Sequence, residues 1–199
     1  MYQPLLDVLE PTMLAVCRSS LEKHAGEHFY GVALYTSGEY NYLVDSIATT
    51  EGLGWVARKY LQDKYYQENW GTLEVAAREL KWSPCDSPLH CEFDGMFAAA
   101  QDVLDAIWKA VDRDSDDIYM KTCELIHDTC IAVMTKVRAS GLFDEDQVLF
   151  NLLMGDQSNE ERLLNAEALN SESVLARFRS ELVIDDEQLE NLRVNRWRM

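Results

Sequence analysis

The sequence is short of glycine and proline, and it carries fewer basic than acidic side chains. Its 199 residues include nine Gly and four Pro, which excludes a collagen-like or low-complexity chain. Aromatic residues make up 10% of the chain, a content that argues against intrinsic disorder. A chain of this length usually folds as one domain and buries roughly 70% of its extended surface. We therefore predict a single domain over residues 1–199.

Basic residues are too few for a protein that binds nucleic acid through phosphate contacts. The chain has 18 Lys or Arg against 35 Asp or Glu, a formal net charge of −17. A field of that sign repels nucleic acids and anionic membrane surfaces, and it attracts cations. We therefore expect no nucleic acid and no membrane as partner. The charge favours a basic protein, although an acidic surface can also serve solubility alone.

The charge is unevenly distributed along the chain. Residues 144–190 contain thirteen Asp or Glu against three Arg, a net charge of −10. From about residue 191 the sign reverses, with Arg193, Arg196 and Arg198 around Trp197, so we expect a short basic C-terminal tail. Four Asp between residues 112 and 117, Asp114 among them, indicate a solvated junction between two helices.

Cysteines are few, and they do not form a disulfide framework. There are five of them, an odd number without the dense spacing of small secreted proteins. Met1–Glu10 shows no basic segment followed by an apolar run, so no signal peptide is expected. No run approaches the roughly 18 apolar residues of a transmembrane helix. These features predict a reduced, cytoplasmic protein.

The apolar periodicity predicts an α+β fold, rich in helices, with a small and mostly antiparallel sheet of about four strands. An N-terminal β-hairpin is the clearest element, because two β-branched and aromatic runs flank Ser37-Gly38-Glu39. Strands are expected at residues 29–36, 40–49 and 147–156, and residues 78–84 could form a further strand that ends at the proline. Helices are expected at 3–24, 50–65, 92–111, 117–139, 160–168 and 171–182. The segment 158–161, Ser-Asn-Glu-Glu, resembles a helix N-terminus.

Sequence motifs of the common enzyme classes are missing. The chain has no G-x-S-x-G elbow, P-loop, H-E-x-x-H or G-x-G-x-x-G segment. We therefore assign no catalytic residue and expect no cofactor.

Cysteine and histidine spacing leaves one metal hypothesis open. Cys123, His127 and Cys130 share one face of a predicted helix, and Cys85, His90 and Cys91 could add ligands. The spacing differs from that of known zinc motifs, and helix-face cysteines are commonly core residues. Packing is therefore the favoured interpretation, and no metal site is predicted.

The most distinctive local sequence is LKWSPCDSPLH, residues 80–90. Two prolines predict a rigid loop, because each restricts the preceding Ser to extended backbone. The loop could act only as structure, with Asp86 bonded to nearby amides, or it could form the rim of a pocket. In the second case Asp86 and His90 supply acid–base capacity. The candidate binding residues are Tyr35, Trp82, Ser83, Asp86 and His90.

Several segments together resemble a known family. They are the hairpin FYGVALYTSGEYNYLVDSIATTEGL, the segment KWSPCDSPLH, the strand QVLFNLLMGDQSNEE and the later ALNSESVLARF. This combination is similar to the bacterial family catalogued as domain of unknown function 4303, over roughly residues 5–182. Ser87 departs from the family pattern, in which an aromatic residue is common at that position. The resemblance implies a cytosolic α+β protein and no established activity.

Three functional hypotheses follow. The first is a non-enzymatic acidic binding protein, such as an immunity-like partner of a cationic toxin, motivated by the net charge. The second is a small enzyme or metal-dependent hydrolase that uses the KWSPCDSPLH loop. The third is a homo-oligomeric interaction module, because aromatic residues are enriched at interfaces and Tyr60, Tyr65, Tyr66 and Trp70 lie close together in sequence.

Overall fold

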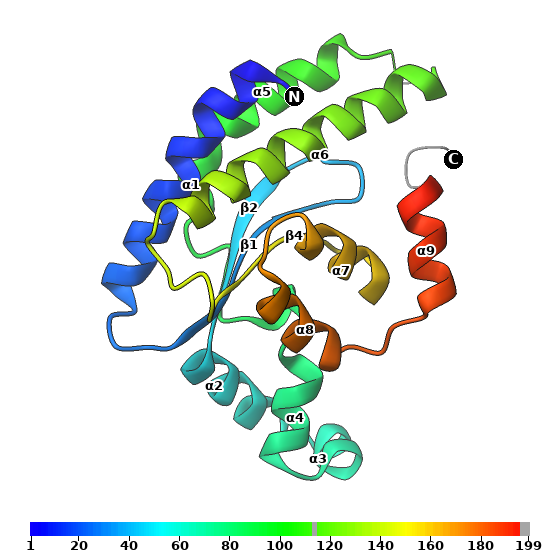
Figure 1. Cartoon of the computed structure of the whole chain (residues 1–199). Helices are drawn as coiled ribbons and strands as arrows, with labels where there is room; N and C mark the ends of the chain where they lie inside the picture. Colours follow the sequence, from blue (N-terminus) through cyan, green and yellow to red (C-terminus); the bar gives the residue numbers. More distant parts are fainter. Residues whose placement is uncertain (113–114, 196–199) are drawn as a thin grey trace.

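The computed structural model describes residues 1–112 and 115–195, and it shows a four-stranded sheet with helices on both faces (Figure 1). The strands are β1 (Phe29–Thr36), β2 (Leu43–Thr49), β3 (Leu89–His90) and β4 (Leu149–Met154). The helices are α1 (Gln3–Lys23), α2 (Thr50–Tyr60), α3 (Lys64–Trp70), α4 (Leu73–Leu80), α5 (Ala98–Ala110), α6 (Asp116–Ala139), α7 (Asn159–Glu167), α8 (Glu172–Ser180) and α9 (Asp186–Asn195). Two short 3₁₀ helices are η1 (Pro84–Asp86) and η2 (Asp94–Phe97).

The predicted N-terminal hairpin is confirmed. Strands β1 and β2 pair antiparallel, with Val32 opposite Ile47. From Val32 onward side chains alternate between the two faces of the sheet, as the pleat requires. Val32 and Leu34 enter the main core, whereas Gly31 and Ala33 line the opposite face. Strand β1 is buried on both sides because helices cover both faces.

The sheet is mixed, so the prediction of a mostly antiparallel sheet is wrong on this point. The strand order is β3-β2-β1-β4, and β4 runs parallel to β1 with Phe150 opposite Val32. A parallel strand needs a long crossover connection, and α5 and α6 provide it between β3, which runs in the same direction as β1, and β4. As a result, the carboxyl ends of β1 and β4 lie at the same edge of the sheet.

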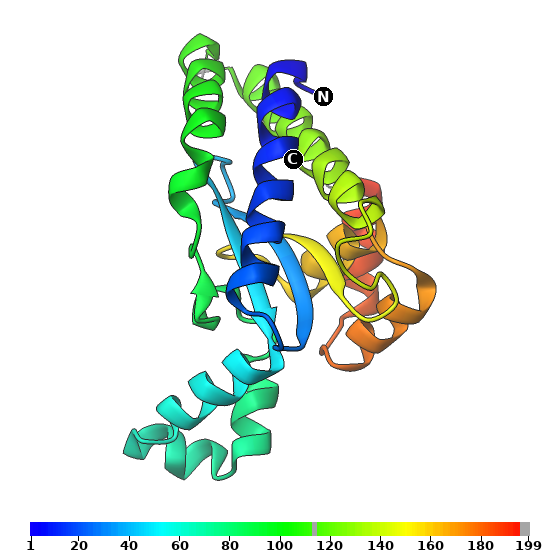
Figure 2. The same cartoon turned by 90° about the vertical axis from the view of Figure 1, so that its left-hand side faces the viewer.

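The prediction of a strand at residues 78–84 is also wrong. Residues 78–80 are the last residues of α4, and the rest of the segment forms the loop after it. Thr72 caps α4 by accepting a hydrogen bond from the amide of Val75, and Ala76 and Leu80 face inward one helical turn apart. The helix expected at 50–65 is divided as well, since α2 ends at Tyr60 and Asp63 caps α3. Helices α2, α3 and α4 form an arm that projects from the body (Figure 2).

The two faces of the sheet carry separate hydrophobic clusters. Helices α1, α5 and α6 pack on one face around Leu34, Phe150 and other fully buried side chains. Helices α7 and α8 lie on the opposite face, where Phe178 and Leu149 belong to a smaller cluster. Within the described ranges, none of the helices is both long and apolar enough to traverse a bilayer.

At Gly52, α2 closely approaches the loop before β3. A Cβ atom added there would be 2.9 Å from Pro88 Cγ and 2.9 Å from Thr49 Oγ1, too close for unstrained packing. We expect Gly52→Ala to lower the free energy of unfolding by about 1–2 kcal/mol through overpacking. Urea denaturation of the purified variant measures this change.

Gly54 in the same helix is the matched control. A Cβ atom there would be 3.5 Å from the flexible Arg58 side chain, which is ordinary contact. Gly54→Ala should therefore raise stability by about 0.5–1 kcal/mol through helix propensity. Equal effects of the two substitutions would contradict the close approach at Pro88.

Candidate functional site

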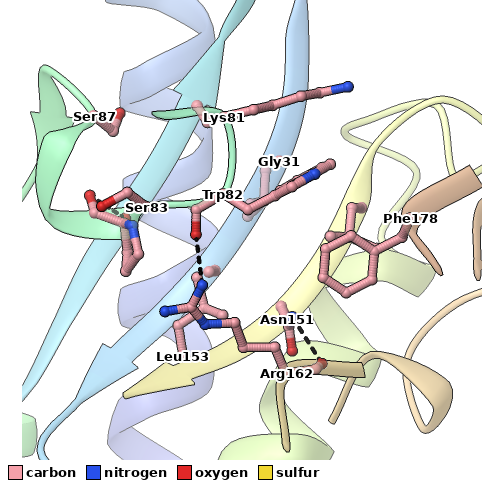
Figure 3. Close-up of a pocket in the computed structure, with 15 residues that line it drawn as sticks. Gly31, Lys81, Trp82, Ser83, Ser87, Asn151, Leu153, Arg162 and Phe178 are labelled. Carbon is pink, nitrogen blue, oxygen red and sulfur yellow. Dashed lines mark hydrogen bonds between the residues drawn. The ribbon is translucent and has the colours of Figure 1, made fainter. Parts of the chain in front are cut away.

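The loop after α4 crosses the face of the sheet that carries α7 and α8 (Figure 3). Trp82 lies over Gly31 and makes edge-to-face contacts with Tyr30 and Phe178, at centroid distances of 5.3 Å and 4.8 Å. Its indole N–H donates to a carboxylate oxygen of Glu181 at 2.8 Å. Trp82 therefore joins the arm, the sheet and α8 by packing.

Ser83 and Asp86 bond to each other within the loop. The hydroxyl of Ser83 donates to Asp86 Oδ2 at 2.6 Å, and the hydroxyl of Tyr60 donates to Oδ1 of the same carboxylate. The bond to Asp86 raises the pKa of Tyr60 to about 12. Both carboxylate oxygens thus accept hydrogen bonds that hold the loop against the arm.

Tyr35 and His90 meet near the carboxyl edge of the sheet. His90 pairs with Ser46 across β3 and β2, and its ring lies edge-on to Tyr35 at 4.7 Å. The thiol of Cys85 donates to the Tyr35 hydroxyl at 3.3 Å. Burial lowers the pKa of His90 and raises that of Tyr35, so both are neutral near pH 7. The structure therefore brings together two predicted residues and Cys85.

Arg162 is the residue of this region that the sequence did not indicate. It extends from α7 across the sheet face, and its Nη1 donates to the backbone oxygen of Trp82 at 3.3 Å (Figure 3). Burial lowers the pKa of its guanidinium. Its Nε is buried and has no hydrogen-bond partner in the described part of the chain. A lone Arg in an acidic helix gives no local signal of this position.

A small cavity of about 40 Å³ lies between the loop, the sheet and α7. Its lining includes the small residues Gly31, Ala33 and Ala48 of the sheet, and Arg162 of α7. Because one water needs about 10–15 Å³ by this measure, the cavity holds about three waters or one small ion. Pockets for cofactors are about 300–1,000 Å³, so this one fits no nucleotide.

Two wider surface grooves run beside the loop. They have volumes of about 510 Å³ and 540 Å³, and both are lined by Tyr30, Thr50, Lys81 and Trp82. A third, of about 410 Å³, lies between α2 and the loop and includes Trp55, Tyr60 and Asp86. They are open to solvent, and none contains the set Tyr35, Cys85 and His90.

The cysteine and histidine sets of the metal hypothesis lie in two different places. On α6, His127 Nε2 is 3.0 Å from the amide oxygen of Asn165, and burial raises the pKa of Cys130 to about 12. His90 and Cys85 lie instead beside Tyr35. Over residues 1–112 and 115–195, no three His, Cys, Asp or Glu side chains gather closely enough to hold a metal ion.

The charged segments of the sequence are partly placed. The expected basic tail begins within α9, a helix not predicted from the sequence, and Arg193 pairs there with Glu167 and Glu190. The rest of that tail, Arg196–Met199, lies outside the described residues, as does Asp114 of the acidic junction.

Comparison with known sequences identifies a family. The profile of a family described as a domain of unknown function (DUF4303) matches residues 9–171. The matched region includes the whole sheet, the loop at residues 80–90 and Arg162, so the chain belongs to this family. No curated protein and no solved structure matches the chain.

Proposed function

We propose that this member of the domain of unknown function 4303 family is a non-enzymatic binding protein for a basic protein, in the manner of an immunity protein that neutralises a cationic toxin. The observation that carries the proposal is the charge arrangement of α7, α8 and α9. Two of their arginines, Arg179 and Arg193, are engaged in ion pairs within the protein, while several acids on and just before these helices face solvent.

The ion pairs show how the basic side chains are used. Arg179 pairs with Asp186, and Arg193 pairs with Glu167 and Glu190. Acids such as Asp156, Glu172 and Glu187 are exposed and form no ion pair among the described residues. An unneutralised field of this kind accelerates the approach of a cationic surface.

Two features of the candidate loop support binding rather than catalysis. Ser83 and Asp86 are occupied by internal hydrogen bonds. The cavity beneath Trp82 is far smaller than a cofactor pocket.

The five cysteines are free thiols, which supports a reducing compartment such as the cytoplasm as the place of action.

The test measures association with basic proteins encoded by neighbouring genes, at low and high salt. The association rate of the true partner should fall at least tenfold between about 50 and 300 mM salt, because the Debye length shortens. The triple variant D156N/E172Q/E187Q should lower the rate at low salt, with little change in the dissociation rate.

A matched variant removes the same charge elsewhere. D94N/D102N/D117N neutralises three exposed acids near and on α5 and α6, and it should change the rate less. A rate that is insensitive to salt would contradict the proposal. A loss of binding through Trp55→Ala alone would also contradict it, because Trp55 is 53% exposed on the arm and not in the acidic region.

A further inference from the structure

Strand β4 is the last strand in the order β3-β2-β1-β4, so one of its two sides has no neighbouring strand in the described part of the chain. An edge of this kind normally presents unpaired N–H and C=O groups, to which a strand of another molecule can bond. Alternate residues of a strand point these groups to opposite sides. The amides of Phe150, Leu152 and Met154 donate to side chains, which identifies their side as the outer edge of β4.

Asn170 occupies both outward groups of Phe150. The amide of Phe150 donates to Asn170 Oδ1 at 2.8 Å, and Asn170 Nδ2 donates back to the oxygen of Phe150 at 2.7 Å. Two residues that face each other in a hydrogen-bonded antiparallel pair exchange the same two bonds. Asn170 Nδ2 also donates to the oxygen of Ala166 in α7 at 2.8 Å, which holds the side chain in place. The side chain of Asn170 therefore imitates the peptide groups of a neighbouring strand.

Further amide side chains continue along the same edge. Asn165 Nδ2 donates to the oxygen of Leu152 at 2.7 Å. The amide of Leu152 donates to Asn151 Oδ1 at 2.9 Å. The amide of Met154, at the end of the strand, donates to Gln157 Oε1 at 3.2 Å. All three outward N–H groups of β4 are thus bonded to side chains of the same chain.

One short segment supplies most of these side chains. Gln157 precedes α7, Asn165 lies within it and Asn170 follows it, and α7 lies beside β4 (Figure 1). Asn151 also donates to the backbone oxygen of Arg162 in α7 at 3.2 Å (Figure 3). An amide suits this place because it carries both a donor and an acceptor, whereas a carboxylate only accepts and an ammonium group only donates. We call these four side chains the edge amides: Asn151, Gln157, Asn165 and Asn170.

The strand behind the edge amides has the composition of a segment that pairs with itself. Its sequence, LFNLLM, contains no charge, no proline and no glycine. Segments of six such residues pair with copies of themselves when an edge is open. The strand itself therefore carries no charge that would repel the same strand of a second molecule.

We propose that the edge amides close β4 against strand addition, and that the strand they exclude is β4 of a second copy of this chain. Two copies with open edges would meet about a two-fold axis, with each β4 bonded to the other. Removal of an edge amide therefore creates a surface for self-association. The proposal concerns the protein without its partner, so it is independent of the binding of a basic protein.

Asn170→Ala opens both outward groups of Phe150 and tests the proposal. In sedimentation equilibrium, the molar mass of this variant should rise from that of the natural sequence towards twice that value as the protein concentration increases. In dilute solution the amide proton of Phe150 should exchange with solvent at least about tenfold faster than in the natural protein. The exchange should slow again at high concentration, because the second copy then accepts the hydrogen bond.

Asn170→Asp separates an open edge from a loss of stability. It keeps an acceptor for the amide of Phe150 and adds a negative charge at the edge, although it loses the donor. It should therefore keep the molar mass of the natural sequence. Asn159→Ala is the matched control, because Asn159 donates to the backbone oxygen of Val183 and not to β4. It should change neither the molar mass nor the exchange of Phe150.

Gln157→Ala provides a test that does not depend on Asn170→Ala folding, since it removes a bond only at the end of the strand. It should shift the molar mass in the same direction, by a smaller amount. The proposal is overturned if the folded variants keep the molar mass of the natural sequence at every concentration. Equal association of Asn170→Asp and Asn170→Ala would overturn it as well, because lost stability would then be the cause.

Discussion

Asp45→Asn should stabilise the protein by about 2–3 kcal/mol at pH 7 and have little effect near pH 4. Asp45 lies on β2, fully buried beneath the helices of the main core. Its Oδ1 accepts a hydrogen bond from the amide of Phe93 at 3.1 Å. Its Oδ2 is buried and has no partner among the residues described, so an ionised carboxylate is poorly accommodated there.

The pH dependence follows from the direction of the pKa shift. Burial, and secondarily the charge of Glu92, raises the pKa of Asp45 to about 6, whereas an unfolded Asp has a pKa of about 3.9. Between these values the folded state holds a proton that the unfolded state has lost. The contribution of Asp45 to stability therefore falls as pH rises from about 4 to 6 and stays low above that range.

Urea denaturation of both proteins at several pH values measures the effect. The difference in unfolding free energy between Asp45→Asn and the natural sequence should grow from pH 4 to 6 and then level off. Asp94→Asn, an exposed neighbour in η2, should show no comparable growth. A difference independent of pH would mean that Asp45 does not titrate in this range.

Trp82→Ala should lower the free energy of unfolding by about 3 kcal/mol, the scale of removing a large packed aromatic side chain. The substitution removes the contacts with Tyr30 and Phe178 and enlarges the cavity over Gly31. It also leaves Glu181 without the indole N–H. Thermal or urea unfolding measures the loss.

Two variants test the structural role of Trp82. Trp82→Phe keeps an aromatic ring between the same neighbours and loses the bond to Glu181, so it should cost less than half as much. Trp55→Ala, at an exposed position on the arm, should change stability by under about 1 kcal/mol. If Trp82→Ala were as stable as Trp55→Ala, Trp82 would not be a packing residue.

Much of the local structure was predictable because it depends on residues close in sequence. The hairpin followed from strand-forming runs around one short turn. Ser158 and Glu161 cap α7 reciprocally, as the Ser-Asn-Glu-Glu segment indicated. The observed bounds of α1 and α6 also lie within one residue of the predicted bounds, because apolar periodicity marks the buried side of a helix.

The same local rules failed where competing patterns overlap. Residues 78–84 contain apolar and aromatic side chains followed by a proline, which suits a strand end as well as a helix end. The Thr72 cap and the inward positions of Ala76 and Leu80 favoured the helix α4. The interior contacts of the arm, which pack Leu80 against α2, are made only in the folded chain.

By itself, the sequence determined the α+β class, the hairpin, most helices, the net charge and the family resemblance. Tertiary structure alone decided that β4 pairs parallel to β1, that Asp86 holds the loop to Tyr60, and that Arg162 reaches Trp82 from α7. The physical reason is the range of the interactions. Caps, turns and periodicity act within a few residues, whereas strand order and the burial of a charge depend on segments brought together by the whole core.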